Sequence, residues 1–478
     1  MTGRVSIAGT ELVSVTRIDD LTTPVAAFLR LAKDRNNAFL LESVEGGSFR
    51  GRFSAIGFDP DLIWTVEKGR PFLQEAASDD PTPDGSDPVA SLRRLVEASH
   101  LPELDSIPSI ASGLYGYIGY DLIRAIEPLP DHQSADPAGI PEARLIRPRT
   151  VIVFDALKQE ITAYGRLPAG GSAAEAGKAL ELLLSELDAP LPAAGAAEPE
   201  MIDPVSTFDA EAYRASVDLV KNHIRAGDIF QGVLSQRFST PFSLPAFALY
   251  RALRRSNPSP FLFHFQFDGY AVTGSSPEIL VRLRDGVVTV RPIAGTRPRG
   301  ANPAEDNAHE ADLLSDPKER AEHMMLLDLG RNDVGRVARP GTIRITEREI
   351  VERYSHVMHI VSNVEGELAD GEDAISALFA GFPAGTVSGA PKVRAMQILD
   401  SIEPHRRGYY AGAAGYFSFD GNMDMAIALR TALIKDGQMH VQAGAGIVLD
   451  SDPEAERQEC INKARALFRA AEQAHRFV

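Results

Sequence analysis

The stretch EILVRLRDGVVTVRPI, residues 278–293, decides the fold class. Apolar and polar residues alternate on both sides of Asp285-Gly286, and Asp-Gly favours the two-residue turn of an antiparallel hairpin. The same pattern returns in AAGYFSFDGNMDMAIALRTALIKDGQMHVQ, residues 413–442, around Asp-Gly at positions 420 and 436. These repeated hairpins predict antiparallel sheets.

Helices with clear ends lie between the hairpins. Asp209 is placed to cap a helix that Gly227 ends, and Asp316 and Asp452 each precede a proline at the first helical position. Helices interleaved with hairpins are typical of an α+β fold rather than a parallel doubly wound sheet. We therefore expect two antiparallel β-sheets packed in a sandwich with helices outside.

A stretch rich in alanine, glycine and proline divides the chain at about residues 167–206. It predicts an N-terminal domain over residues 1–195, a linker over 196–206 and a C-terminal domain over 207–478. Before the boundary, runs such as DLIWTV and TVIVFD predict a mixed, mainly β structure. No internal repeat of 20 to 50 residues interrupts either part.

Composition excludes several classes of partner and site. The 478 residues are 44% apolar and carry a net charge of −17, which argues against nucleic acid or an anionic membrane surface as main partner. No signal-peptide pattern and no apolar run of about 20 residues occurs, so we expect a cytoplasmic protein. Cys460 is the single cysteine, which excludes an intrachain disulfide and a cysteine zinc cluster.

Two glycine patterns suggest nucleotide binding, but their neighbours argue against it. Residues 295–300 have the spacing of a phosphate loop, yet Ala301 and Asn302 stand where lysine and serine or threonine are needed. Residues 442–449 carry GxG without a third glycine and close a hairpin. Both segments are left with two interpretations: tight turns alone, or backbone that can approach an anion closely.

Scattered polar residues leave their chemistry open. Glu322 lies in a helical pattern, and Glu459 precedes Lys463 by four residues. Glu459 could form an exposed ion pair, or the two glutamates could supply oxygen ligands for Mg²⁺. His359 lies in an alternating run and is either structural or catalytic. No pattern supports an acyl-transfer nucleophile, so we expect no glutamine-hydrolysing domain.

Six segments in order carry a specific resemblance. Residues 207–472 resemble the chorismate-binding enzyme family, and LLES and RFSAIGFDP near the N-terminus are similar to anthranilate synthase component I and aminodeoxychorismate synthase. The six segments are PIAGTRPRG, DLGRNDVGRV, YSHVMHIVSNVEG, GTVSGAPKVRAMQILD, RRGYYAGAAGYF and VQAGAGIVLDSDPEAERQECINKA.

Two positions distinguish the reactions of this family. Ala294 stands where aminodeoxychorismate synthases often carry a nucleophilic lysine, and Gln231 stands where isochorismate and salicylate synthases carry a lysine that activates water. The resemblance therefore implies the component I reaction. In it, Mg²⁺-dependent conversion of chorismate and ammonia gives anthranilate and pyruvate, the first committed step of L-tryptophan biosynthesis, with feedback inhibition by tryptophan. The alternatives are aminodeoxychorismate synthase component I and a non-catalytic, tryptophan-binding regulatory homologue.

The same resemblance implies a role for individual residues and for partners. Glu322 and Glu459 would bind Mg²⁺, Glu278 would be the general acid, and His359 would serve the elimination of pyruvate. Ammonia would come from a glutamine amidotransferase subunit, component II, in an assembly of two catalytic and two glutaminase chains. The substrate-binding positions are Gly295, Thr296, Thr386, Tyr410, Arg430, Gly444, Ala445, Gly446 and Lys463, and the tryptophan-binding positions are Ser43, Pro260, Phe261 and Leu262.

Overall fold

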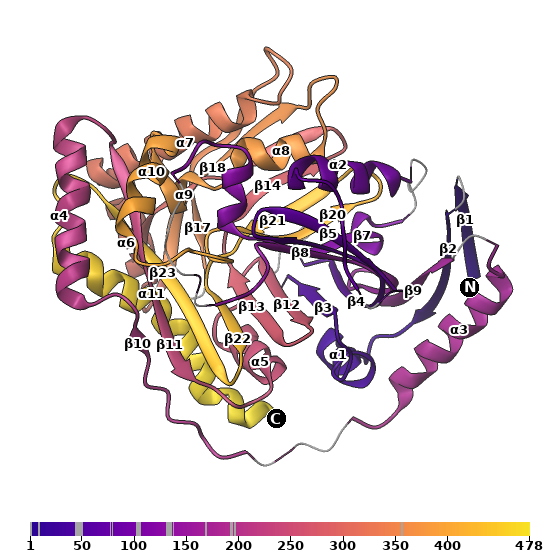
Figure 1. Ribbon diagram of the computed structural model, residues 1–478. Coiled ribbons are helices and arrows are strands. Elements are labelled where there is room, and N and C mark those ends of the chain that lie inside the picture. The colour runs from indigo at the N-terminus through magenta and orange to yellow at the C-terminus, as the bar shows by residue number, and fades with distance from the viewer. Residues whose placement is uncertain are drawn as a thin grey trace.

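The fold alternates runs of strands with helices along the chain (Figure 1). This computed structural model describes residues 2–478 except 8–9, 44–50, 77, 79, 102–106, 131–135, 137, 168–169, 192–194, 196 and 355–356. The strands are β1 (Thr2–Ile7), β2 (Thr10–Ile18), β3 (Ala38–Glu42), β4 (Phe53–Glu67), β5 (Arg70–Glu75), β6 (Thr82–Pro83), β7 (Gly113–Ile118), β8 (Ala143–Asp155), β9 (Glu160–Leu167), β10 (Val205–Ser206), β11 (Gln231–Pro241), β12 (Phe261–Phe267), β13 (Tyr270–Ser276), β14 (Ile279–Arg284), β15 (Val287–Val290), β16 (Ile293–Pro298), β17 (Arg344–Arg353), β18 (Val357–Glu367), β19 (Gly389–Ala390), β20 (Ala413–Ser418), β21 (Met423–Ile427), β22 (Thr431–Lys435) and β23 (Gln438–Ile447).

The helices begin and end at residues with recognisable roles. Asp209, Asp316 and Asp452 each cap a helix through the side chain, and Gly227 ends the first of these at φ 80°. The helices are α1 (Pro24–Leu31), α2 (Pro88–Ala98), α3 (Ala173–Ser185), α4 (Ala210–Ala226), α5 (Ala246–Ser256), α6 (Pro303–Ser315), α7 (Pro317–Gly335), α8 (Ala374–Gly381), α9 (Gly385–Ser388), α10 (Lys392–Ile402) and α11 (Pro453–Gln473), with 3₁₀ turns η1 (Ser109–Ala111), η2 (Tyr120–Ala125), η3 (Glu186–Asp188) and η4 (Ala474–Phe477).

Two antiparallel layers share the long β4–β8 pair. Around this pair one layer runs β1-β2-β9-β8-β4-β3-β12-β13-β22-β23-β11. The other runs β5-β4-β8-β7-β20-β21-β14-β15-β18, with β16 and β17 also paired to β18. The register of β4 against β8 shifts between Pro60 and Leu62, where a bulge increases the local twist and bend. The α+β prediction is confirmed, and the two expected sheets are hydrogen-bonded into one.

Aromatic side chains fill the space between the layers. Phe39 of β3 stacks on Tyr115 of β7 with ring centroids 4.2 Å apart, and both are fully buried. Trp64 of β4 is buried as well, and its indole N–H donates to Ser91 Oγ at 2.9 Å. Phe39 also meets Phe265 of β12 and Tyr115 meets Tyr416 of β20, with ring centroids 6.4 and 5.8 Å apart. Large aromatic rings remove much apolar surface from water, so this cluster holds the N-terminal and C-terminal strands together.

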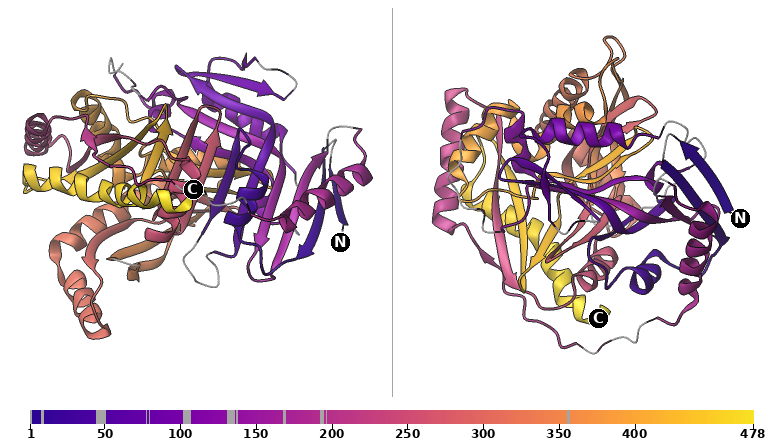
Figure 2. Two further views of the ribbon diagram at one scale, coloured as in Figure 1. Left: turned by 90° about the horizontal axis from the view of Figure 1, so that it is seen from below. Right: turned by 45° about the vertical axis from the view of Figure 1, so that its right-hand side comes forward.

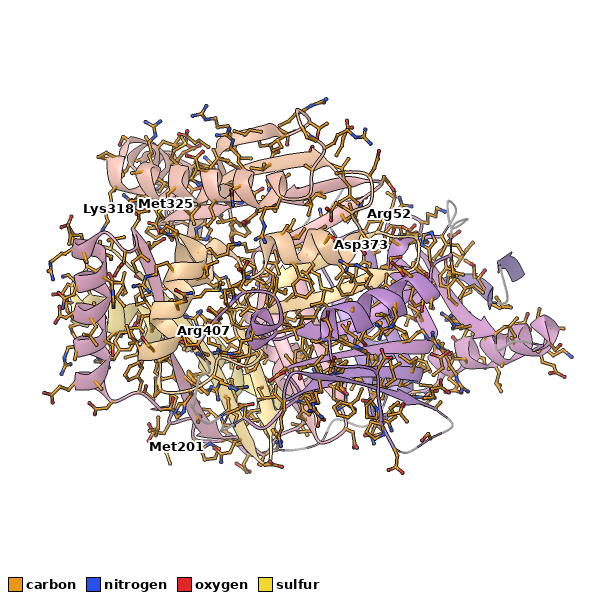
Figure 3. The ribbon with its side chains drawn as sticks, turned by 45° about the horizontal axis from the view of Figure 1, so that its top comes forward. Arg52, Met201, Lys318, Met325, Asp373 and Arg407 are labelled. Carbon is orange, nitrogen blue, oxygen red and sulfur yellow. The ribbon has the colours of Figure 1, made fainter. Side chains whose placement is uncertain are left out.

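Helices cover the outer faces of the sheet. Helices α4, α5, α10 and α11 bury their apolar sides against β11, β22 and β23. Helices α7 and α8 pack on β14, β16 and β18. Arg93 of α2 pairs with Asp373, the residue labelled at the start of α8 in Figure 3, at 2.7 Å. None of the helices in the described ranges is long and apolar enough to cross a membrane.

The predicted domains are joined through the sheet. Strand β3 pairs with β12 and β7 pairs with β20, so strands from both sides of the predicted boundary are hydrogen-bonded. Residues 197–204 form neither helix nor strand, and Figure 2 shows this stretch outside the body of the fold, leading into β10. Residue 196, where the predicted linker begins, lies outside the described residues. The domain boundaries stay a prediction.

Candidate active site

The proposed general acid lies at a strand junction in the interior. Glu278 occupies the short connection between β13 and β14 and is only 7% exposed. Its Oε1 accepts a hydrogen bond from Thr386 Oγ1 of α9 at 3.0 Å. Burial raises the pKa of Glu278 to about 8, against the opposing effects of Thr386 and of the positive charges on Arg430 and Lys463. The carboxyl group is therefore protonated at neutral pH and suited to donate a proton.

His359 lies on β18 beside two of the predicted substrate-binding residues. Its Nδ1 is 2.9 Å from the carbonyl oxygen of Gly295 and 3.1 Å from Thr296 Oγ1. Since a carbonyl oxygen only accepts, Nδ1 donates in the first of these bonds, and Nε2 is the ring atom left to exchange a proton. Burial lowers the pKa of His359, so its neutral form dominates at neutral pH.

Glycine is needed at position 295 for a backbone reason. Gly295 has φ +68° and lies where the register between β16 and β18 shifts. L-residues with a side chain rarely adopt this conformation. The tight-turn interpretation is therefore replaced by a bulge inside β16, which directs the carbonyl of Gly295 to His359.

The second glycine pattern is also extended strand. Gly444, Ala445 and Gly446 lie within β23 and pair with β11, so the tight-turn interpretation is wrong here too. A Cβ at Gly444 would lie 2.8 Å from the hydroxyl of Tyr410, and one at Gly446 would lie 2.6 Å from Gln231 Nε2. A side chain at either position would displace its neighbour. Glycine therefore lets the side chains of Tyr410 and Gln231 approach the backbone of β23 closely.

Two cationic side chains complete the set of predicted substrate-binding residues. Arg430, at φ +48° between β21 and β22, contributes positive charge to both Glu278 and His359. Lys463 of α11 donates to the carbonyl oxygen of Gly444 at 3.0 Å. Hydrogen bonds and electrostatic interactions thus connect Glu278 and His359 with five of the predicted substrate-binding residues: Gly295, Thr296, Thr386, Arg430 and Lys463.

The two candidate metal ligands face the same region. Glu322 of α7 accepts a hydrogen bond from Gln231 Nε2 at 3.0 Å. Its pKa is raised, mainly by burial and further by the negative charges of Glu319 and Glu459. Glu459 lies 2.7 Å from Lys463 Nζ and is about half exposed, so the alternative ion pair also forms.

This donor set fits a divalent cation. A partly buried carboxylate near two others is electrostatically unfavourable, and a bound cation would relieve that repulsion. In the described part of the chain no three histidine, cysteine or acidic side chains converge as a metal site. Mg²⁺ commonly takes one or two protein carboxylates and completes its shell with water and substrate oxygens, which is the number that Glu322 and Glu459 supply.

Two buried ion pairs support the site and were not predicted. Arg407 pairs with Glu403 at 2.7 Å, lies over the ring of Tyr410, and donates to the carbonyl oxygen of Val387, next to Thr386. Arg407, labelled in Figure 3, is only 2% exposed. Lys392 of α10 pairs with Asp333 of α7 at 2.9 Å. Arg407 and Lys392 both lie in segments that carry the resemblance, but the sequence pattern does not reveal their partners.

A separate cavity of about 670 Å³ lies between the layers, and the four predicted inhibitor residues line it. Ser43 follows β3, Pro260 precedes β12, and Phe261 and Leu262 begin that strand. The polar part of the lining includes Glu42 and Arg282. These residues meet because β3 and β12 are paired. A second long-range contact, between Arg254 and the carboxylate of Glu42, joins residues more than 200 positions apart.

Comparison with known proteins places this architecture in a family. The chorismate binding enzyme family matches residues 36–469. Anthranilate synthase component 1 of Cereibacter sphaeroides is 55% identical over 96% of this chain and 94% of its own, and that of Pseudomonas aeruginosa is 47% identical over 98% and 96%. The crystal structure of anthranilate synthase component I from Streptococcus pneumoniae is 36% identical, with a TM-score of 0.80 over 94% of this chain and 98% of its own. These matches show that the chain belongs to the chorismate binding enzyme family, with proteins named anthranilate synthase component 1 among its relatives.

Proposed function

We propose that this chain is the catalytic component of an anthranilate synthase and converts chorismate and ammonia into anthranilate, pyruvate and water. One observation carries the proposal. The site combines a buried, protonated Glu278 with a neutral His359, while Ala294 and Gln231 replace the lysines of related reactions. Without either lysine, ammonia itself is the attacking group.

The first step follows from the protonation state of Glu278. Its carboxyl proton goes to the C4 hydroxyl of chorismate, the C4–O bond breaks, and water leaves as ammonia forms a bond to C2. The hydrogen bond from Thr386, 3.0 Å from Oε1, holds the carboxyl group in place and stabilises the carboxylate that remains. Gln231 donates to Glu322 and has no basic nitrogen, so it does not activate water for the competing hydroxylation.

The second step is elimination of pyruvate from the aminated intermediate, which makes the ring aromatic. His359 is the proposed group for a proton transfer in this step, through Nε2, because Nδ1 donates to Gly295. Arg430 and Lys463 orient the two carboxylates of the substrate by charge and hydrogen bonding, together with the backbone of residues 444–446. Thr296 and Tyr410 complete the proposed contacts.

Glu322 and Glu459 are the proposed Mg²⁺ ligands. When bound, Mg²⁺ supplies Lewis-acid polarisation of the substrate carboxylate and helps to fix the ring. Gln231 orients the Glu322 carboxylate through its 3.0 Å hydrogen bond, which is a typical role for a residue behind a metal ligand. Lys463 balances charge beside Glu459.

The proposed nitrogen source is a separate glutaminase subunit, because the sequence has no pattern of a glutamine-hydrolysing site. We expect the purified chain to form anthranilate from chorismate, Mg²⁺ and ammonium, but none when glutamine replaces ammonium. Anthranilate fluorescence measures both reactions, and boiled protein is the control. Glutamine-dependent product from the chain alone would contradict the partner proposal. The arrangement of two catalytic and two glutaminase chains and the cytoplasmic location stay predictions.

L-tryptophan is the proposed ligand of the 670 Å³ cavity. Its apolar residues suit an indole ring, and its acidic and basic side chains suit an amino acid zwitterion. We expect anthranilate formation to fall as L-tryptophan is added, with D-tryptophan as a matched control that leaves activity much less affected. Unchanged chorismate turnover at millimolar L-tryptophan would contradict this proposal.

A further inference from the structure

Tyr354 lies between the interlayer cavity and the catalytic histidine. It lines the 670 Å³ cavity, and its ring meets that of His359 edge to face, with centroids 5.5 Å apart and planes 64° apart. Tyr354 is only 8% exposed. One aromatic side chain therefore contacts both the cavity and the imidazole of His359.

Tyr354 is held by hydrogen bonds at its side-chain hydroxyl and at its backbone carbonyl. Its hydroxyl donates to Glu352 at 2.7 Å, and its carbonyl oxygen accepts from Arg299 at 2.6 Å. Glu352 is in turn paired with Arg291 at 2.7 Å, and Arg291 also lines the cavity. The ring is thus fixed by an ion-pair cluster that forms part of the cavity wall.

The hydrogen bonds of the His359 imidazole lie on one side of the ring. Gly295 and Thr296 hold His359 through one ring atom, Nδ1. Because both hydrogen bonds are made by the same atom, they do not fix the tilt of the imidazole plane, and packing must restrain it. Edge-to-face aromatic contacts favour a defined orientation. Tyr354 supplies such a contact, so the direction of Nε2 depends on where the tyrosine ring stands.

The general acid is close to the same wall. Pro277 and Ile279, the neighbours of Glu278 in sequence, both line the cavity. Ile279 and Arg291 also line a small cavity of about 30 Å³ that Glu278 and Thr386 share. A ligand in the larger cavity would therefore touch residues adjacent to both catalytic groups.

We propose that Tyr354 is a positioning residue for His359 and carries the effect of cavity occupancy to the catalytic site. The inference rests on the proposed function, and it names the residue through which inhibition would act. A ligand changes the catalytic geometry only if it contacts one arrangement of the wall better than another. Tyr354 provides that contact, and displacement of its ring reorients Nε2 of His359.

The test compares Tyr354→Leu, which removes the ring, with Tyr354→Phe, which keeps the ring and loses only the bond to Glu352. Misplacement of a catalytic group by about 1 Å costs on the order of 10²-fold in rate. We expect elimination to slow by about 10- to 100-fold in Tyr354→Leu, so that the aminated, non-aromatic intermediate is released. Tyr354→Phe should release far less, and the control Glu67→Gln, at an exposed position at the end of β4, none. Chromatography of products from chorismate and ammonium measures the ratio of intermediate to anthranilate.

Calorimetry separates binding of L-tryptophan from inhibition. Tyr354→Leu should still bind L-tryptophan while its remaining turnover is no longer inhibited. If wild-type protein neither binds nor responds to tryptophan, the feedback proposal fails, whereas release of the intermediate would still support positioning by Tyr354. Anthranilate as sole product of Tyr354→Leu, with unchanged kcat, would overturn the inference. If Tyr354→Leu does not fold, Tyr354→Trp is the second variant, because its larger ring cannot occupy the position of the tyrosine ring. Formation of anthranilate without release of the intermediate by Tyr354→Trp would also overturn the inference.

Discussion

Glu278→Gln is expected to lower kcat by about 10²- to 10⁴-fold, the usual contribution of a positioned proton donor. Glutamine keeps the size of the side chain and can still accept from Thr386, but it has no acidic proton for the C4 hydroxyl. Steady-state anthranilate formation at saturating chorismate, Mg²⁺ and ammonium measures the change. Glu67→Gln, at an exposed position at the end of β4, is the matched control and should leave kcat unchanged.

The pH dependence of the wild type tests the same assignment. The pKa of Glu278 is about 8 because of burial, so its acid form dominates at neutral pH and is lost as pH rises through that value. We therefore expect kcat/KM, which reports groups of the free enzyme, to fall above about pH 8. Glu278→Gln should lack this alkaline limb in its residual activity. An unchanged limb, or full activity of the variant, would exclude Glu278 as the proton donor.

Glu322→Gln is expected to abolish most Mg²⁺-dependent turnover, with a loss of about 10²-fold or more, since Lewis-acid stabilisation is worth several kcal/mol. Glutamine leaves a neutral oxygen ligand and removes the charge that attracts the cation. Activity as a function of Mg²⁺ concentration and calorimetric Mg²⁺ titration give the two readouts. Asp328→Asn, an exposed carboxyl on the same helix, is the control.

Two experimental results would contradict the assignment of Glu322 as a metal ligand. If Glu322→Gln keeps normal turnover at the Mg²⁺ concentration that saturates the wild type, Glu322 is not a metal ligand. Lost activity with unchanged Mg²⁺ affinity would also contradict that role, because a ligand must affect binding. A weaker Mg²⁺ affinity together with partial rescue at high Mg²⁺ is the expected pattern.

The hairpins and helix ends could be predicted because their signals are local. Asp285 and Gly286 adopt φ +50° and +74° between β14 and β15, the left-handed backbone that an Asp-Gly turn needs. The shared β4–β8 pair could not be predicted, since Phe53 pairs with Asp155 across a long stretch of chain. Periodicity shows which face of a strand is buried and does not identify its partner.

In the candidate site, too, the sequence indicates individual residues but not which of them are in contact. Gln231 and Glu322 are 91 positions apart, and Thr386 and Glu278 are 108 apart, so spacing alone could not pair them. The family resemblance identified these residues, and the fold brings them together. Glu459 illustrates what spacing leaves open: it does form the expected pair with Lys463, a contact that is compatible with a position beside a metal. Its role as a ligand stays a prediction.

An experiment with ¹⁵N-labelled ammonium tests the proposed addition of ammonia at C2 of chorismate. The purified chain is incubated with chorismate, Mg²⁺ and the labelled ammonium, and the products are separated and identified by mass spectrometry and nuclear magnetic resonance. We expect anthranilate that carries ¹⁵N, together with an equal amount of pyruvate. Labelled 4-amino-4-deoxychorismate, or unlabelled isochorismate, as the main product would contradict it.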